Sequence, residues 1–382
     1  MPRTQQRASL ILVASAWLLA ANGPAVCVSS SNDPPVDASA SDATGGGGAG
    51  QMGSSFDGGP ASGADGGQQI DAKPQALTGY LWYVGVAVNA FTKSQTMSSS
   101  ESGPSVTVAP NWPVGTFQDL VFDQMGNLWT IPTTGDQVLR FPGAQLMNNA
   151  TPFPELVVSS TALNSPQSLA LDTAGNLWVV NFAGAGISIA NIVRFDGLVG
   201  KTGKLDLTPS LTISPGGDDA SKALFSEGTA LAFSPSGKLW FGGANDVLGL
   251  GDVSGMSGQV TATPKAVLST GESYSSLGFS PGGALWVTAT KAGYFALRFD
   301  QPDKLGGNVT KESARLTLPA PDAMFVGGLG FDTAGNVWAA TSKKLFQFLS
   351  ADSIMGTVTQ SPAVELGVGI GVPSLGSKLV LR

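Results

Sequence analysis

The chain has 382 residues, a formal net charge of −7, 12% charged residues and no histidine. The missing histidine excludes a Ser-His-Asp triad, a histidine zinc site and proton transfer by imidazole. A single cysteine excludes an intrachain disulfide and a cysteine metal cluster. An acidic chain also lacks the basic surface that nucleic acid requires, so we expect no nucleic-acid partner.

The N-terminus has the pattern of a secretion signal. Residues 1–7 include Arg3 and Arg7, and residues 8–21 form an apolar stretch. This stretch is shorter than the roughly 20 residues of a transmembrane helix, but it suits a signal peptide. We therefore predict a signal peptide over residues 1–26 and a protein that acts outside the cytoplasm.

Cys27 follows this segment and resembles the lipidated cysteine of bacterial lipoproteins. Val26 and Pro24 depart from that family's pattern, so cleavage after Ala25, which leaves a free Cys27, is the alternative. Residues 27–77 are rich in Gly, Ser, Asp and Ala, and we predict a disordered tether there. The protein is then either lipid-anchored in the cell envelope or secreted, and the lipid would be its one contact with a membrane.

One repeat motif occurs five times, and each copy begins with Leu, contains Asp or Ser followed three residues later by Gly, and ends in Trp. The copies are residues 120–129, 169–178, 231–240, 277–286 and 329–338. Each copy indicates a strand, a turn and a second strand, because the polar side chain can cap a turn and Gly allows a positive φ. A third strand, ending in apolar-Arg-Phe in three copies, and a fourth strand follow.

Four strands in about 50 residues are typical of a β-propeller blade. We predict an all-β fold over residues 78–382: a propeller of six four-stranded blades, the last closed by strands from both termini. The closing pair would be Gly369–Val372 beside Tyr80–Ala87. Seven blades are the alternative, because the C-terminal copy carries two strands.

The recurring Asp-x-x-Gly-Asn-Leu-Trp sequences resemble those of NHL-type six-bladed propellers, over about 300 residues. The resemblance implies the architecture. It does not imply one activity, because such propellers have many roles.

We expect the repeated residues to be structural. The Trp side chains should pack between neighbouring sheets. Asp123, Asp172 and Asp332 should cap turns rather than bind calcium, because Ser234 and Ser280 take the same position in two copies. The arginines of the third strands should pair with acids or face solvent.

Function is then expected in the loops between second and third strands and in those that lead into each new blade. Within them, the insertion Gly216–Glu227 is the longest and is a candidate recognition loop. The predicted ligand-binding residues are Trp112, Asp136, Asn181, Asn245, Asp246, Glu272, Tyr274, Lys291 and Tyr294.

Three functions remain open. The first is a monomeric, non-catalytic module without a cofactor that binds a protein, peptide or glycan. The second is a calcium-dependent hydrolase similar to the lactonases with six-bladed propellers, whose sites need Asn, Asp and Glu around one cation. The segment Tyr80–Phe91 contains no acid to match the first ligand of that family. The third is a structural component of an envelope assembly.

Overall fold

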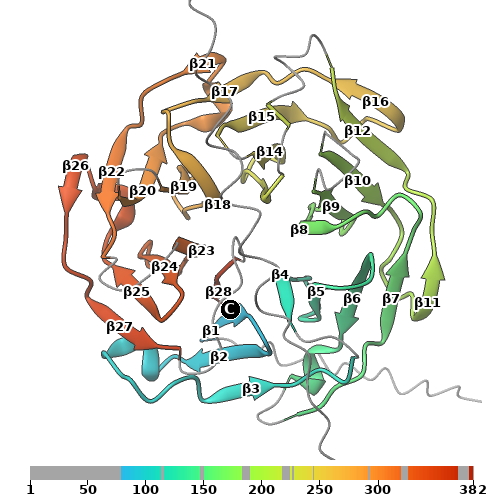
Figure 1. Ribbon diagram of the computed structural model, residues 1–382, viewed down its shortest axis with the longest axis horizontal. Coiled ribbons are helices and arrows are strands. Elements are labelled where there is room, and N and C mark those ends of the chain that lie inside the picture. Colours follow the sequence, from blue (N-terminus) through green and yellow to red (C-terminus); the bar gives the residue numbers. More distant parts are fainter. Residues whose placement is uncertain are drawn as a thin grey trace, which may run out of the picture. The chain divides into compact units, whose positions relative to one another are not determined.

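The computed structural model describes ten stretches of the chain: residues 79–112, 116–146, 150–182, 190–216, 224–225, 228–243, 245–290, 293–319, 326–368 and 378–381 (Figure 1). The expected signal peptide, the expected tether with Cys27, and most of the insertion Gly216–Glu227 lie outside the described residues. In the described part, no helix has the length and apolar character needed to cross a membrane.

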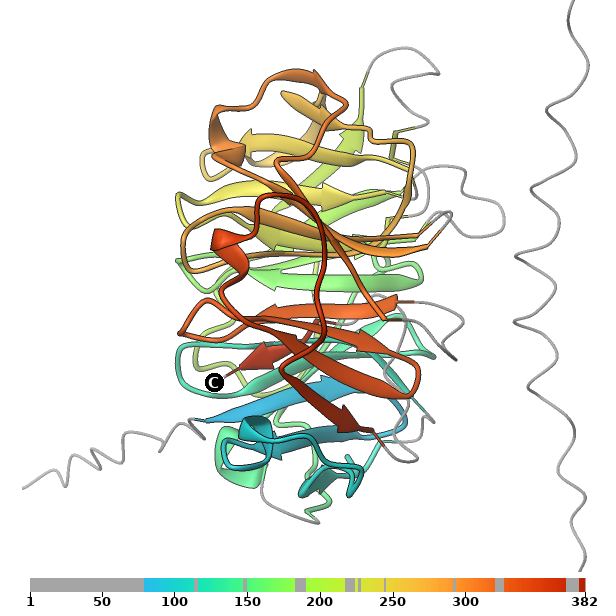
Figure 2. The ribbon, with the colours of Figure 1, turned by 90° about the vertical axis from the view of Figure 1, so that its left-hand side faces the viewer.

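Six β-sheets stand as blades around one axis (Figure 1). The predicted all-β, six-bladed propeller is confirmed, and the seven-bladed alternative is wrong. Each blade has four strands of its own, as predicted, and four of the six sheets also hold a fifth strand from the blade that follows. Seen from the side (Figure 2), the strands run from one face of the ring to the other, so the connections gather on two faces.

Blades 1 to 3 use the first half of the chain and its last strand; strands are named here from the axis outward. Blade 1 contains β28 (Val380–Leu381), β1 (Tyr80–Val84), β2 (Val88–Thr92) and β3 (Val106–Val108). Blade 2 contains β4 (Phe117–Phe122), β5 (Leu128–Pro132), β6 (Gln137–Phe141) and β7 (Leu156–Ser159). Blade 3 contains β8 (Pro166–Leu171), β9 (Leu177–Asn181), β10 (Asn191–Phe195) and β12 (Leu211–Pro215).

Blades 4 to 6 follow the same antiparallel order. Blade 4 contains β13 (Ala230–Phe233), β14 (Lys238–Gly242), β15 (Val247–Asp252) and β17 (Ala266–Leu268). Blade 5 contains β18 (Ser273–Phe279), β19 (Leu285–Thr290), β20 (Tyr294–Phe299) and β22 (Ala314–Thr317). Blade 6 contains β23 (Val326–Phe331), β24 (Val337–Thr341), β25 (Lys344–Phe348) and β27 (Val364–Gly367).

The fifth strand of a blade comes from the blade that follows it. It belongs to a strap, our name for the connection between the third and fourth strands of a blade. The strap strands pair in parallel with β7, β12, β17 and β22, and they are β11 (Gly203–Asp206), β16 (Gly258–Ala262), β21 (Gly307–Val309) and β26 (Gly356–Thr359). The straps of blades 1, 2, 5 and 6 each contain a short 3-10 helix: η1 (Gln95–Met97), η2 (Gly143–Gln145), η3 (Pro302–Lys304) and η4 (Ala351–Ser353). The straps cover the outer edges of the original four-stranded sheets.

The ring is closed by strands from both termini, as predicted. The closing strand is β28, which places Leu381 opposite Leu81 and Val380 opposite Trp82 in β1. The prediction of Gly369–Val372 as the closing strand is therefore wrong, because β28 takes the position beside β1; those residues themselves lie outside the described part.

Each copy of the repeat motif forms the first two strands of a blade. In blade 3, for example, Leu169 pairs with Val179 and Leu171 with Leu177. The turn between the two strands requires glycine, because Gly175 has a φ of 78°. Apolar residues alternate along the two strands of the motif. The strands form a hairpin, and this alternation directs the apolar side chains toward the adjacent blades.

Six hydrophobic clusters form the core, and each one joins two adjacent blades. Trp178 of blade 3, for example, shares a cluster with Phe241 of blade 4. Trp82, Trp178, Trp286 and Trp338 are fully buried in this way. The packing role predicted for the repeated Trp is confirmed, and loss of one such ring would cost on the order of 3–5 kcal/mol.

Candidate functional site

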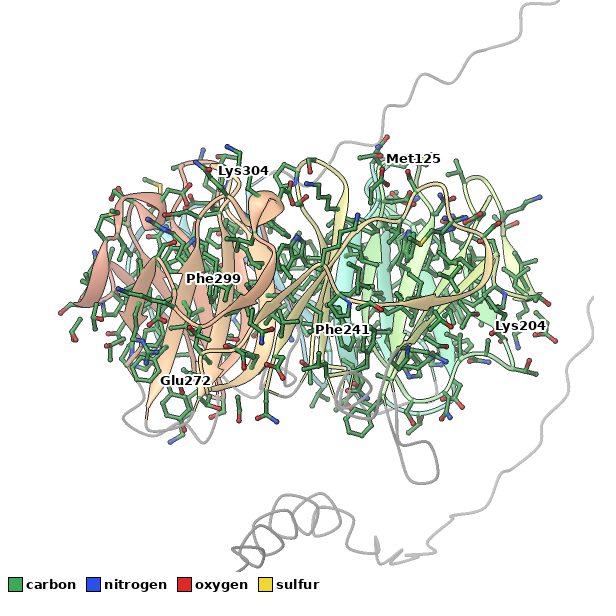
Figure 3. All side chains as sticks on the ribbon, turned by 90° about the horizontal axis from the view of Figure 1, so that it is seen from above. Met125, Lys204, Phe241, Glu272, Phe299 and Lys304 are labelled. Carbon is green, nitrogen blue, oxygen red and sulfur yellow. The ribbon has the colours of Figure 1, made fainter. Side chains whose placement is uncertain are left out.

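The connections of the propeller divide between two faces. The turn face carries the turns of the repeat motif and the straps. The loop face carries the loops between second and third strands and the segments that lead into each new blade, and the predicted site residues belong to these segments. Figure 3 shows Met125 and Lys304 on the turn face and Glu272 on the opposite, loop face.

The aspartates of the repeat motif hold their own turns. Asp172 accepts hydrogen bonds from the main-chain N of Asn176 at 2.9 Å, from its Nδ2 at 3.0 Å, and from Nε1 of Trp178 at 2.9 Å. Asp123 makes the equivalent bonds in blade 2. The turn-capping prediction is confirmed, and donors of the chain itself occupy these carboxylates.

The third-strand arginines of blades 2 and 5 tie their blade to the strap of the next one. Arg140 is buried, forms an ion pair with Glu155 at 2.7 Å and lies over the ring of Trp129 at 5.2 Å. Its Nη1 also donates to the carbonyl oxygen of Leu198, in the strap of blade 3, at 3.1 Å. Arg298 reaches the strap of blade 6 in the same way. Pairing with acids was predicted, whereas the bridge to the strap was not.

Two predicted ligand-binding residues hold a lead-in segment of the loop face. Asn181 is buried, donates through Nδ2 to the carbonyl oxygen of Ala162 at 2.8 Å, and accepts from the main-chain N of Asn164 at 3.0 Å. The carboxylate of Asp136 accepts from the main-chain N of Ser165 at 2.7 Å. Both side chains therefore fix the segment between β7 and β8. The sequence alone does not distinguish this structural role from ligand binding.

Trp112 and Tyr294 lie apart from each other and from this segment. Trp112 is half-buried and packs on the cluster between blades 1 and 2, while Tyr294 packs on the cluster between blades 5 and 6. The nine predicted residues therefore do not form one site. Lys291 lies outside the described residues.

The predicted residues do come together at the junction of blades 4 and 5. Asn245 is exposed in the β14–β15 loop, and its Oδ1 lies 3.5 Å from Oγ of Ser273. Tyr274 is buried at the start of β18, and its hydroxyl shares a 2.7 Å hydrogen bond with Thr270. Burial raises the pKa of Tyr274, and the negative charges of Asp246 and Glu272 raise it further.

Glu272 is the unusual group of this junction. The residue is 9% exposed, and its Oε1 accepts from Nη1 of Arg315 at 3.1 Å. Its Oε2 is buried and has no hydrogen-bond partner among the residues that the structure describes. Arg315 also pairs with Glu312 at 2.7 Å and lies over the ring of Phe295 at 4.6 Å. A buried carboxylate oxygen without a donor is costly, so this position is prepared for a hydrogen-bond donor.

Arg315 was not predicted as a site residue. It stands on the fourth strand opposite Leu297, a position that Val157 and Val267 occupy in blades 2 and 4, but Thr212 and Glu365 occupy it in blades 3 and 6. Because polar and charged residues also occur at this position, the sequence contained no clear signal for Arg315.

A second missed group lies where the inner strands meet. Asp119 of β4 is fully buried, and its carboxylate accepts from Oγ of Ser168 at 2.6 Å and from Nζ of Lys378 at 2.9 Å. It also accepts from the main-chain N of Leu120, Leu169 and Lys378, at 2.9, 3.0 and 3.0 Å. Five donors occupy its two oxygens. Among the described residues, no three His, Cys, Asp or Glu side chains gather as metal ligands.

No family model and no curated protein match the chain. Similar solved structures include a protein of unknown function from Bacteroides caccae, with 10% identity and a TM-score of 0.49 over 79% of this chain and 99% of that one. A streptogramin B lyase has 13% identity and a TM-score of 0.44 over 74% and 83%. The Cps50 (Swd1) β-propeller domain of Myceliophteria thermophila has 11% identity and a TM-score of 0.45 over 76% and 88%. These likenesses concern the fold alone.

Proposed function

We propose that the chain is an NHL-like propeller that is exported from the cytoplasm and binds a protein, peptide or glycan without catalysis. The signal-like N-terminus and the Gly-rich segment behind it support display outside the cytoplasm, with or without a lipid on Cys27. The repeated Asp and Arg side chains are engaged in turns and straps. Polar side chains of the loop face that have no such role are therefore the best candidates for ligand contact.

The observation that carries the proposal is the unpartnered Oε2 of Glu272. A ligand ammonium or hydroxyl that donates to this oxygen would remove the cost of its burial. Asn245 and Asp246 stand at the same junction and offer further polar contacts. The ligand is therefore expected to present a hydrogen-bond donor to the junction of blades 4 and 5.

We favour binding over calcium-dependent hydrolysis, because the buried acid among the inner strands, Asp119, already accepts five hydrogen bonds. Melting of the purified full chain with chelator and with added calcium tests this preference. We expect the same melting temperature in both. A large rise with calcium, together with bound metal, would instead support the hydrolase, since selective binding stabilises the native state.

Site-specific photo-crosslinking in the organism that makes the protein tests the binding function. A crosslinker at Asn245 should give a defined adduct, and a crosslinker at the exposed Met125 on the turn face should not. Glu272→Gln should weaken the adduct strongly, because a neutral amide accepts a hydrogen bond less well than a carboxylate does. Glu312→Gln is the matched control, since it removes the other acid on Arg315. Equal adducts from both faces, or an adduct unaffected by Glu272→Gln, would contradict the proposal.

A further inference from the structure

A pocket of about 80 Å³ lies between blade 4 and the strap of blade 5. We call it the blade 4 pocket, and its lining includes Lys238, Trp240, Gly249, Lys265 and Asp303. Asp303 belongs to η3, whose neighbour Lys304 marks the turn face in Figure 3. The pocket is therefore on the face opposite Glu272.

The pocket exists because blade 4 lacks the third-strand arginine. Trp129 pairs with Arg140 and Trp178 with Arg194, and each guanidinium covers the ring of its Trp, at 5.2 and 5.3 Å. In blade 4 the residue opposite Trp240 is Gly249. In the described part of blade 4 no guanidinium covers the ring, and the Trp240 ring lies against Gly249, where a Cβ would stand 3.0 Å from it.

The link between blade and strap is kept by another residue. Nζ of Lys238 donates to the main-chain carbonyl oxygen of Asp303 at 2.8 Å. This bond replaces the arginine bridge without closing the space beside Trp240. The contact between blade 4 and the strap of blade 5 is therefore present although the blade 4 pocket lies between them.

The pocket offers both an acceptor and a donor. Oδ2 of Asp303 accepts from Ser234 at 3.0 Å and from Ser236, whereas its Oδ1 is buried and has no partner in the described part of the chain. The stem of Lys265 lies against Gly251, and its ammonium forms no hydrogen bond with a described residue. An unpartnered acceptor and an available donor beside an aromatic ring suit a ligand group that has an N–H, a C=O and an apolar part.

Charge favours a neutral group. Lys238 and Lys265 bring two positive charges, and Asp303 and the nearby Asp252 bring two negative ones. Hydrogen bonds from Ser254 lower the pKa of Asp252, and the charges of Lys265 and Lys238 lower it further. An added guanidinium would meet the two lysines at the wall, and an added carboxylate would meet Asp303.

We propose that the blade 4 pocket binds the acetamido group of an N-acetylated sugar. The amide N–H would donate to Oδ1 of Asp303, the carbonyl oxygen would accept from Lys265, and the methyl group would contact Trp240. The sugar ring would remain at the mouth, beside the apolar rim of Pro302. A volume of about 80 Å³ suits a small group of this kind, with the rest of the ligand outside the pocket.

Titration calorimetry of the full chain with N-acetylglucosamine tests the proposal. Glucose, glucosamine and Nε-acetyl-lysine are the comparison ligands. We expect N-acetylglucosamine to bind at least tenfold more tightly than each of them. Equal binding of glucose would overturn the role of the acetamido group, and stronger binding of acetyl-lysine would overturn the assignment to a sugar.

Variants locate the binding. Lys265→Met keeps the stem against Gly251 but removes the donor, so it should weaken binding at least tenfold. Lys204→Met, in the exposed β11, is the matched control and should bind as the unchanged chain does. Gly249→Arg should abolish binding by placing an arginine where blades 2, 3 and 5 have one. If that variant does not fold, Lys265→Met still tests the pocket. Unchanged binding by Lys265→Met would overturn the proposal, whereas Glu272→Gln, on the loop face, should have no effect on it.

Discussion

At the scale of single residues, Asp172 supplies the acceptor for the buried indole of blade 3, since Nε1 of Trp178 donates to its carboxylate. Among the described residues, Nε1 of Trp286 has no partner in the blade whose turn begins with Ser280, and Nε1 of Trp338 has none in blade 6, where Oδ2 of Asp332 accepts from Gln347. Asp172→Ser should therefore lower the free energy of unfolding by about 1–3 kcal/mol, measured by urea denaturation. Asp206→Ser, on the exposed β11, should change it by less than about 0.5 kcal/mol. Equal losses in the two variants would contradict this account.

A second prediction concerns Tyr83, whose hydroxyl donates to the carbonyl oxygen of Val368 at 3.3 Å. Burial raises the pKa of Tyr83, because the phenolate is poorly solvated inside the blade. Above about pH 10 the unfolded chain releases this proton while the folded chain retains it, so stability falls as pH rises. Tyr83→Phe should make the decline between pH 9 and 11 less steep in urea denaturation. Identical slopes would show that Tyr83 does not contribute.

At the scale of elements, the closing strand β28 requires a glycine on β23. A Cβ at Gly330 would stand 2.1 Å from the carbonyl oxygen of Leu379, immediately before β28. Gly330→Ala should therefore displace β28 and destabilise the ring by about 1–3 kcal/mol. Gly278 occupies the same position of the motif in blade 5, where the nearest atom would lie at 3.6 Å. Gly278→Ala is thus a matched control, and thermal melting that affects both variants equally would contradict this reasoning.

The sequence predicted the strands in which apolar and polar side chains alternate. It did not predict the strands that pair with a neighbour through their main chain alone. The Leu and Trp positions of the motif gave the inner hairpins, because one face of each strand is buried. The strap strand β11 is short and mostly exposed, and it pairs with β7 through its main chain. Its sequence therefore carries no alternation that could predict a fifth strand.

The candidate site could also be predicted only in part from the sequence. Asn245 and Glu272 meet because the loops of consecutive blades lie side by side on one face. Asn181 and Asp136 have the same chemistry in the sequence, yet they hold main-chain N–H groups of a lead-in segment. The three-dimensional structure is needed to distinguish a polar residue that caps a loop from one that is available to a ligand.

At the scale of the whole molecule, an ion pair that joins distant parts of the chain closes the ring. Lys378 lies two residues before β28, and its Nζ lies 2.9 Å from Oδ2 of Asp119 in blade 2. Lys378→Met would leave a buried carboxylate without its counter-ion, and a loss of about 3–5 kcal/mol in the free energy of unfolding is expected. Asp119→Asn combined with Lys378→Met should recover part of this loss. Additive losses in the double variant would contradict the pairing.

Removal of residues 378–382 goes further, because it takes away β28 as well as the ion pair. Each blade packs mainly on its two neighbours, so the effect should be greatest in blades 1, 2 and 6. Hydrogen exchange of the truncated chain should therefore accelerate in β1 and β4 much more than in β14, on the far side of the ring (Figure 1). Lys378→Met retains β28 and should accelerate β4 more than β1. A uniform acceleration in all six blades would instead mean that closure stabilises the propeller as one cooperative unit.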